Sequence, residues 1–207
     1  MTPGEIEHLS FKIIDQEAGH HDFDPRQWKI VQRMIHTSAD FDYIKSVRFH
    51  EKAVSQGIKA IQSGCTIITD TGMAKAGIRK KGIHLFNGQV HCFISDPDVI
   101  KKAKDMKTTR AAAAIDKACS GKDRLIFALG NAPTALIRLL ELIKAGKVEP
   151  ELVVGLPVGF VNAAESKAAL MAADIVHISN TGRKGGSNIA ASVINALTIM
   201  AAEEHRR

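Results

Sequence analysis

His36 and Arg33 are the two residues of this 207-residue chain whose types and spacing best fit proton-transfer chemistry. They lie three positions apart in a segment where apolar residues recur at helical spacing, from Trp28 to Ile35, so we expect an amphipathic helix. On such a helix both side chains fall away from the apolar face and next to each other. Histidine exchanges protons near neutral pH without special tuning, which makes His36 a candidate proton donor or acceptor.

A purely structural interpretation of His36 stays open at this point. A cation near the C-terminal end of a helix complements the helix dipole. Thr37, Ser38 and Asp40 are typical of the turn that follows such a helix. A histidine beside an arginine does not establish catalysis by itself, because an acid–base assignment needs converging geometry.

The elements that would position these residues alternate along the chain, which favours a parallel sheet covered on both faces. We expect an α/β fold: a mostly parallel sheet with helices on both faces, three-layer α/β/α and flavodoxin-like, preceded by N-terminal helices. A single domain would cover residues 1–207. The expected strands are 65–70, 90–95, 124–129, 152–155 and 175–178. The expected helices are 45–62, one opening at Asp96-Pro97, 108–118, one capped by Asn131 and stopping before Gly146, 165–173 and 187–202.

Composition narrows the class of protein. Apolar residues make up 45% of the chain and charged residues 24%, which is ordinary for a soluble globular protein. We find no apolar run long enough to span a membrane and no secretory signal pattern. Three widely spaced cysteines favour reduced thiols and a cytoplasmic location. The cluster of His20, His21, Asp22 and Asp24 lacks metal-ligand spacing, so we interpret it as a polar loop and expect no metal site.

The net charge of +6 favours anionic partners, which include nucleic acids, phosphates and polycarboxylates. The chain has one Trp and one Tyr and no basic stripe interleaved with aromatic residues. Stacking on single-stranded nucleic acid is therefore not expected. A nucleic-acid-binding module driven by charge alone is one alternative function, and it would require steeply salt-dependent binding.

Ligands of open α/β sheets bind beyond the carboxyl ends of the strands. Four expected loops at that edge are rich in small polar residues: 69–72, 130–134, 155–159 and 179–187. Helix N-termini after such loops offer free N–H groups to anions, and the last loop adds Arg183 and Lys184 beside glycines. This loop matches neither the P-loop nor the dinucleotide-binding fingerprint. A phosphate- or nucleotide-binding domain that uses residues 182–187 is the second alternative.

Six blocks of sequence, taken in order, resemble those of one family. They are Ser10-Phe11-Lys12-Ile13-Ile14, Arg33-Met34-Ile35-His36, Thr109-Arg110-Ala111, Gly130-Asn131-Ala132-Pro133-Thr134-Ala135-Leu136, Pro157-Val158-Gly159-Phe160-Val161 with Ala163-Ala164-Glu165-Ser166-Lys167, and Gly182-Arg183-Lys184-Gly185-Gly186-Ser187 with Asn195-Ala196-Leu197. Together they resemble the precorrin-8X methylmutase family of cobalamin biosynthesis, also called cobalt-precorrin-8 methylmutases. Leu9 departs from the basic residue expected before Ser10.

The resemblance implies an isomerase that moves a methyl group from C-11 to C-12 of a corrin precursor, giving hydrogenobyrinate or its cobalt form. It implies no cofactor and no protein-bound metal, and a homodimer with its site near the interface. The matching proton donor or acceptor is His36. The substrate, a polycarboxylate corrinoid with or without cobalt, would be the partner, with no nucleic acid and no membrane. The expected substrate-binding residues are Ser10, Arg33, Arg110, Asn131, Thr134, Arg183 and Ser187.

Overall fold

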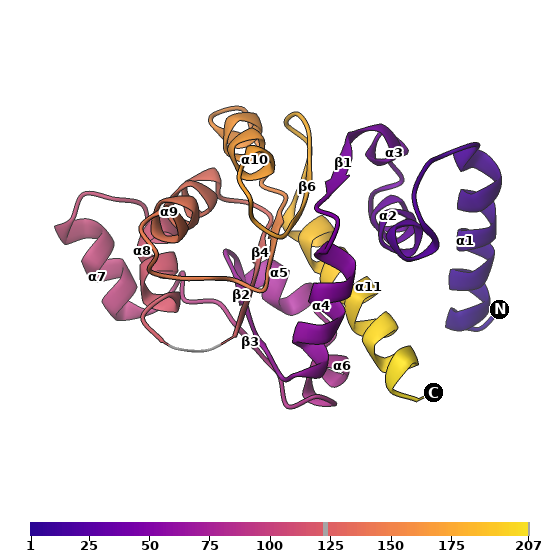
Figure 1. Cartoon of the computed structure of the whole chain (residues 1–207), viewed down its shortest axis with the longest axis horizontal. Coiled ribbons are helices and arrows are strands. Elements are labelled where there is room, and N and C mark those ends of the chain that lie inside the picture. Colours follow the sequence, from indigo (N-terminus) through magenta and orange to yellow (C-terminus); the bar gives the residue numbers. More distant parts are fainter. Residues whose placement is uncertain (122–123, 207) are drawn as a thin grey trace.

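A six-stranded sheet runs through the middle of the molecule (Figure 1). The computed structural model describes residues 1–121 and 124–206. Five strands are parallel to one another, and the short edge strand β1 runs antiparallel to β6. In spatial order the strands are β1 (Val47–Phe49), β6 (His177–Asn180), β5 (Leu152–Gly155), β4 (Leu125–Leu129), β2 (Thr66–Thr69) and β3 (Gln89–His91).

The order of the five parallel strands is that of a flavodoxin-like sheet. Counted along the chain from β2, they lie in the order 2-1-3-4-5. The strand order reverses direction between β2 and β4, and ligands of such sheets bind beyond the carboxyl ends of the strands at this switch point. The expected α/β architecture is confirmed, and the loops after β2 and β4 lie at this switch point.

Helices cover both faces of the sheet, because successive strand residues point to opposite sides. In β4, Ile126 and Ala128 join one apolar core, whereas Leu125, Phe127 and Leu129 join the other. The first face is covered by α4 (Ala53–Gln62), α5 (Gly72–Gly77), α6 (Lys80–His84) and α11 (Ser187–His205), and α2 (Pro25–Ser38) packs on α11. The second face is covered by α8 (Arg110–Ala118), α9 (Pro133–Lys144) and α10 (Ala163–Ala172).

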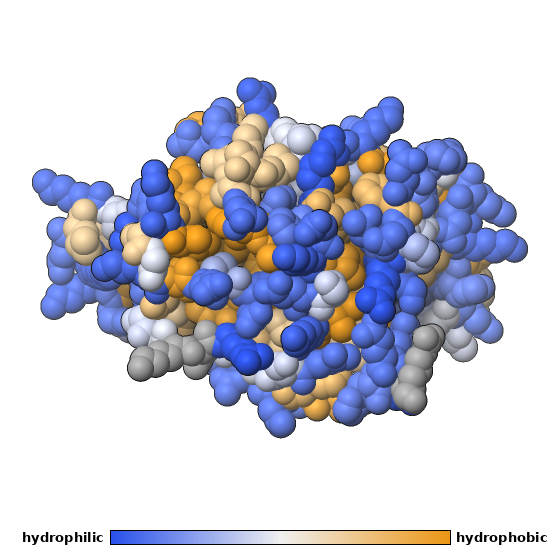
Figure 2. Space-filling model, in the orientation of Figure 1, coloured by the Kyte–Doolittle hydropathy of each residue, from blue (hydrophilic) through white to orange (hydrophobic). Residues whose placement is uncertain are grey.

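Two helices lie outside these layers, at opposite ends of the molecule (Figure 1). Helix α1 (Pro3–Ala18) packs against α2, and α7 (Pro97–Asp105) packs against α8. Hydrophilic side chains cover most of the visible surface at both ends, while apolar surface gathers between them (Figure 2). Within residues 1–121 and 124–206, no helix is both long and apolar enough to cross a membrane.

Helix α2 is the amphipathic helix that the sequence predicts. Asp24 caps its N-terminus by accepting two backbone N–H groups, and Pro25 opens the first turn. The apolar stripe that includes Met34 and Ile35 is buried, whereas His36 is exposed on the last turn. The helix ends in a left-handed residue, Ala39, whose N–H bonds to a carbonyl group of the last turn.

Several expected elements differ from the structure. The single helix expected over 45–62 is wrong: the helical turn α3 (Tyr43–Ser46) and strand β1 come first, and α4 begins only at Ala53. These elements are too short to show a period in the sequence. Two strands are shifted, since β3 ends at His91 and β6 begins at His177. Helices α5 and α6 were not expected.

Candidate active site

The loops at the carboxyl ends of the strands converge into one tightly packed edge. The Thr71 and Ser187 hydroxyl oxygens lie 2.8 Å apart, which joins the β2–α5 loop to the start of α11. The Gly186 N–H donates to the Leu156 carbonyl oxygen at 3.0 Å and so ties the β6–α11 loop to β5. A Cβ atom on Gly130 would lie 2.5 Å from the Gly186 oxygen. Ser187 is itself buried, so its hydroxyl serves this packing.

A buried carboxylate fills the switch point. Asp70 follows β2, is 2% exposed, and accepts the backbone N–H groups of Gly130 at 3.1 Å, Asn131 at 2.7 Å and Ala132 at 2.6 Å. Burial raises the pKa of Asp70, and the three N–H donors oppose that rise. The sequence predicted that the N–H groups at the α9 N-terminus bind an anionic ligand. In the structure the Asp70 carboxylate binds these N–H groups instead. The expected cap at Asn131 is therefore wrong: the N-cap is Ala132, and only the exposed Asn131 side chain remains for a ligand.

The first turns of α8 and α9 meet at the same edge. Thr109 caps α8 by accepting the Ala112 N–H at 3.1 Å, and its hydroxyl donates to the Thr134 Oγ1 at 3.0 Å. Arg110, the first residue of α8, is exposed beside this contact. The structure therefore brings Arg110, Asn131 and Thr134 to one region, although the first is more than twenty residues from the others in the chain.

His36 and Arg33 are joined by an aromatic side chain of α1. The Phe11 ring meets the His36 ring edge-on at 5.1 Å, and the Arg33 guanidinium lies 5.1 Å from the same ring. Arg33 Nη1 also donates to Glu7 Oε1 at 3.0 Å, and the Arg33 side chain is only 13% exposed. The expectation of a free face for both residues is thus half right: α1 covers Arg33 and leaves His36 exposed.

Ser10 lies next to Phe11 on α1. Its hydroxyl donates to the Ile6 carbonyl oxygen at 2.8 Å within the helix, which leaves the oxygen free to accept a hydrogen bond. Leu9 beside it is 44% exposed. Phe11, the next residue along α1, contacts the His36 ring near the end of α2.

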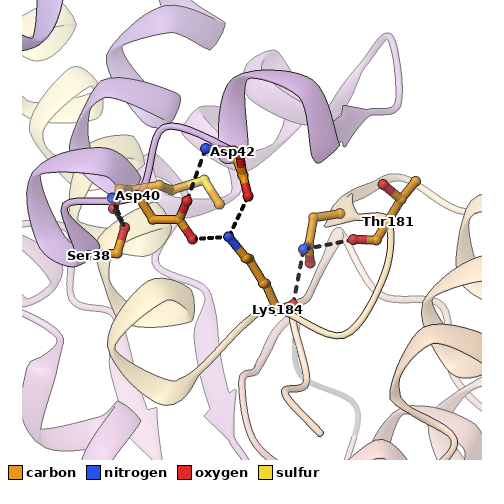
Figure 3. A network of polar contacts seen from close by, with 7 residues as sticks. Ser38, Asp40, Asp42, Thr181 and Lys184 are labelled. Carbon is orange, nitrogen blue, oxygen red and sulfur yellow. Dashed lines mark hydrogen bonds and ion pairs between the residues drawn. The ribbon is translucent and has the colours of Figure 1, made fainter. Parts of the chain in front are cut away.

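Lys184 connects the β6–α11 loop to the chain that leaves α2 (Figure 3). Its Nζ lies 2.6 Å from Asp40 Oδ2 and 2.6 Å from Asp42 Oδ2. The two carboxylates raise the pKa of Lys184. The sequence grouped Lys184 with Arg183 as a cation available to an anionic ligand. The structure corrects this, because acidic residues more than 140 positions away neutralise it.

A buried lysine supports the same loop from inside the protein. Lys167 of α10 is 0% exposed, and its Nζ donates to Asn180 Oδ1 at 3.0 Å and to the Lys184 carbonyl oxygen at 2.6 Å. Burial lowers the pKa of Lys167 to about 8. In the sequence Lys167 stands out only as part of a family block, since a lysine near the middle of a short helix is usually solvated.

Arg183 lies on the exposed rim of this edge. Its guanidinium is 5.5 Å from the Phe160 ring. Phe160 and its neighbour Val161 are 83% and 77% exposed, which is unusual for large apolar side chains on one loop. The rim thus offers a cation beside an apolar surface, a combination suited to an apolar molecule with acidic substituents.

The described residues contain no group of three or more His, Cys, Asp or Glu side chains that could share a metal ion. His21, from the polar cluster noted in the sequence, stacks on Trp28 with ring centroids 3.9 Å apart. The exposed side chains at the carboxyl edge include Arg110, Asn131 and Arg183, and arginine binds carboxylates with two hydrogen bonds.

Known proteins of one family match nearly the whole chain. The sequence model of the precorrin-8X methylmutase family matches residues 5–200. A cobalt-precorrin-8 methylmutase from Priestia megaterium is 48% identical over 201 residues, which cover 97% of this chain and 89% of the relative. A precorrin-8X methylmutase from Pseudomonas aeruginosa is 36% identical over 191 residues, or 91% of each chain.

A solved structure of a protein from the same family also matches the chain. The crystal structure of precorrin-8X methyl mutase from Thermus thermophilus superimposes with a TM-score of 0.91 at 44% identity, and the match covers 97% of both chains. The chain belongs to the precorrin-8X methylmutase family, which are isomerases of cobalamin biosynthesis.

Proposed function

We propose that this enzyme moves a methyl group from C-11 to C-12 of a corrin precursor, with His36 as the proton donor and acceptor. The observation that carries the proposal is the placement of His36. It is exposed on the last turn of α2, its ring is held by Phe11, and the chain beyond it is tied by Lys184 to the loop that bears Arg183. The proposal places the proton-transfer group at the end of α2 and a carboxylate-binding group on the loop that Lys184 ties to the chain after this helix.

The reaction requires the protein to position the substrate and to exchange a proton with it. The bond from the methyl carbon to C-11 breaks as its bond to C-12 forms in the same molecule, so no oxidant, reductant or second substrate is consumed. The protein has to hold the macrocycle in a reactive orientation and exchange a proton with it. The packed loops at the carboxyl edge can hold the macrocycle, and the exposed His36 imidazole can exchange a proton with it.

The rim fits the class of substrate. A corrinoid is a broad apolar ring that carries several carboxylates, and guanidinium groups bind carboxylates with two parallel hydrogen bonds. Arg110 and Arg183 are exposed, and Phe160 offers apolar surface beside the second. We assign Ser10, Arg33, Asn131, Thr134 and Ser187 supporting contacts. Of these, Arg33 would have to share its guanidinium with Glu7, and Ser187 its hydroxyl with Thr71.

We propose that the natural substrate is precorrin-8 with or without cobalt, and that the product is cobyrinate or hydrogenobyrinate. Relatives named cobalt-precorrin-8 methylmutase share 34–48% identity with this chain. Relatives named precorrin-8X methylmutase share 34%, 36% and, for the Thermus thermophilus structure, 44%, so the identities of the two groups overlap. Purified enzyme assayed with the cobalt-bound and metal-free substrates side by side measures which form is converted with the higher kcat/KM.

We propose further that the enzyme is a cytoplasmic homodimer with its site near the interface. Ile6, Leu9 and Ile13 of α1 are 52%, 44% and 43% exposed and lie three and four residues apart, which makes one apolar stripe. The three cysteines are unpaired, as in a reducing compartment. Light scattering should give twice the mass of the chain, and Leu9→Glu should shift it toward the monomer.

The proposed reaction is tested by its product. The wild-type enzyme should convert the substrate, and titration with the product should shift the visible spectrum of the corrinoid to saturation. The enzyme with a nucleotide or with inorganic phosphate in place of the corrinoid serves as the comparison. Absence of both turnover and corrinoid binding would show that the assigned reaction is wrong.

A further inference from the structure

We propose that Lys184 is a positioning residue that fixes the Arg183-bearing loop to the end of α2 that carries His36. The inference rests on the proposed function, because it takes Arg183 and His36 to act on one bound macrocycle. Lys184 is held on two sides: by its backbone from the interior and by its side chain from the surface.

The interior attachment is to the carbonyl oxygen of Lys184. This oxygen accepts the Lys167 Nζ at 2.6 Å and the Asn180 Nδ2 at 3.0 Å. Lys167 also donates to Asn180 Oδ1 at 3.0 Å, so the three groups form a closed triangle. In the part of the chain that the structure describes, no carboxylate pairs with Lys167. These two hydrogen bonds are what compensates the burial of its amine, so they fix the backbone of the loop.

The surface attachment is to the chain that leaves α2 (Figure 3). Lys184 Nζ contacts both Asp40 Oδ2 and Asp42 Oδ2 at 2.6 Å. The Asp42 N–H donates to Asp40 Oδ1 at 3.0 Å and thereby holds the two carboxylates in one arrangement. One ammonium group therefore joins the middle of the β6–α11 loop to the chain just after α2, in addition to the backbone hydrogen bond from the Thr181 N–H to the Ser46 carbonyl oxygen at 2.9 Å.

The path from Asp40 back to His36 is short and constrained. Ala39 adopts the left-handed conformation, and its N–H donates to the Ile35 carbonyl oxygen at 2.7 Å. The Asp40 N–H donates to the Ser38 hydroxyl at 3.3 Å. With its local hydrogen bonds made, this segment has little freedom to move relative to the last turn of the helix. A displacement of Asp40 therefore displaces the helix end that bears His36.

On the other side of the contact, a single peptide bond joins Lys184 to Arg183. The Arg183 carbonyl oxygen accepts the Gly159 N–H at 3.2 Å, and the residue after it is Lys184. Release of the Lys184 side chain would remove the only side-chain ion pairs between this loop and the chain after α2 among the described residues, and would leave the loop held by its backbone hydrogen bonds. Exposed ion pairs add little to global stability, so the two carboxylates on Lys184 point to alignment of the loop rather than to stability of the fold. A misplacement of about 1 Å can lower a rate about 100-fold.

The experiment compares Lys184→Met with Lys184→Arg, which can still pair with two carboxylates. Lys147→Met is the matched control, because Lys147 is an exposed lysine in the α9–β5 loop that forms no ion pair among the described residues. We expect Lys184→Met to lower kcat/KM tenfold to 100-fold with little change in melting temperature. Lys184→Arg should recover most of the loss, and Lys147→Met should match the wild type.

A double-mutant cycle with Arg183→Ala separates positioning from a general structural role. If Lys184 acts through Arg183, Lys184→Met should weaken binding of the product at least fivefold in the wild type and less than twofold in the Arg183→Ala background. Equal effects in both backgrounds, or kcat/KM of Lys184→Met within twofold of the wild type, would overturn the inference while leaving the reaction intact. A wild-type enzyme that neither binds nor converts a corrinoid would overturn the proposed function and this inference with it.

Discussion

The Asp70 carboxylate lies 2.6 Å from the amide nitrogen of Ala132, across the switch point between β2 and β4. This contact joins the ends of two neighbouring strands, and the same oxygen also accepts the Asn131 N–H at 2.7 Å. The protein thus supplies its own anion at the place where many α/β proteins bind a phosphate or a carboxylate. A ligand at this edge must use side chains instead of these N–H groups.

Replacing Asp70 tests how much this contact stabilises the edge. In Asp70→Asn an amide NH2 replaces one acceptor oxygen and must face a backbone N–H, so at least one buried donor loses its partner. We expect the free energy of unfolding to fall by about 1–3 kcal/mol, measured by urea denaturation. Asp105→Asn, at an exposed residue of α7 with no ion pair among the described residues, is the control and should change it by less than about 0.5 kcal/mol. Equal stability of the two variants would contradict this account.

The role of His36 predicts a separation of binding from turnover. His36→Gln keeps a polar side chain of similar size on an exposed turn, so the fold and the affinity for product should change little. Loss of the proton-transfer group should lower kcat about 10²–10⁴-fold. Steady-state kinetics and a spectral titration with the product measure the two effects. His84→Gln, at another exposed histidine, should leave both unchanged, and full activity of His36→Gln would refute the assigned role.

The sequence predicted the parts of the fold that repeat. The alternation of strands and helices gives the parallel sheet, and the apolar spacing in α2 gives both its buried face and the exposure of His36. Each of these is a local pattern that extends over two or more turns or strands. Strand β1 and the turn α3 were missed because three- and four-residue elements contain no full period.

The polar supports of the candidate site could not be predicted in the same way. Asp70 contacts residues about 60 positions away, and Lys184 contacts Asp40 and Asp42 across more than 140. No spacing rule relates such residues. The sequence placed Asp70 at the end of an expected strand and Lys184 in a loop as a cation for an anionic ligand, without indicating the partner of either. The sequence therefore proposed candidate binding residues, whereas the contacts that hold these residues in place became visible only in three dimensions.

Close contact between two loops makes Gly130 a sensitive position. A Cβ atom there would lie 2.5 Å from the Gly186 oxygen and 2.7 Å from the Ser187 Cα, both backbone atoms that cannot rotate away. Gly130→Ala should therefore push the start of α11 from the edge and lower the free energy of unfolding by about 1–3 kcal/mol. Gly72→Ala, where no atom lies within 4 Å of the new Cβ, is the control. Thermal denaturation should show a lower melting temperature only for the first variant.

The buried amine of Lys167 predicts a pH dependence of stability. Burial lowers the pKa of Lys167 from 10.5 to about 8 in the folded protein. Between these values the unfolded chain binds a proton that the folded protein has released, so the free energy of unfolding rises with pH, by up to about 1.4 kcal/mol per pH unit. Below about pH 8 both states hold the proton, and this contribution becomes constant at its lowest value.

Comparison of the wild type with Lys167→Met isolates that contribution, because all other titrating groups are shared. Urea denaturation at pH 7, 8, 9 and 10 should give a difference, wild type minus Lys167→Met, that is flat up to about pH 8 and then increases. The exposed Lys147→Met should show no such slope against the wild type, since its ammonium stays hydrated in both states. Parallel curves for wild type and Lys167→Met would mean that the amine keeps its proton throughout this range in the folded protein, and that the two hydrogen bonds to Asn180 and Lys184 compensate its burial fully.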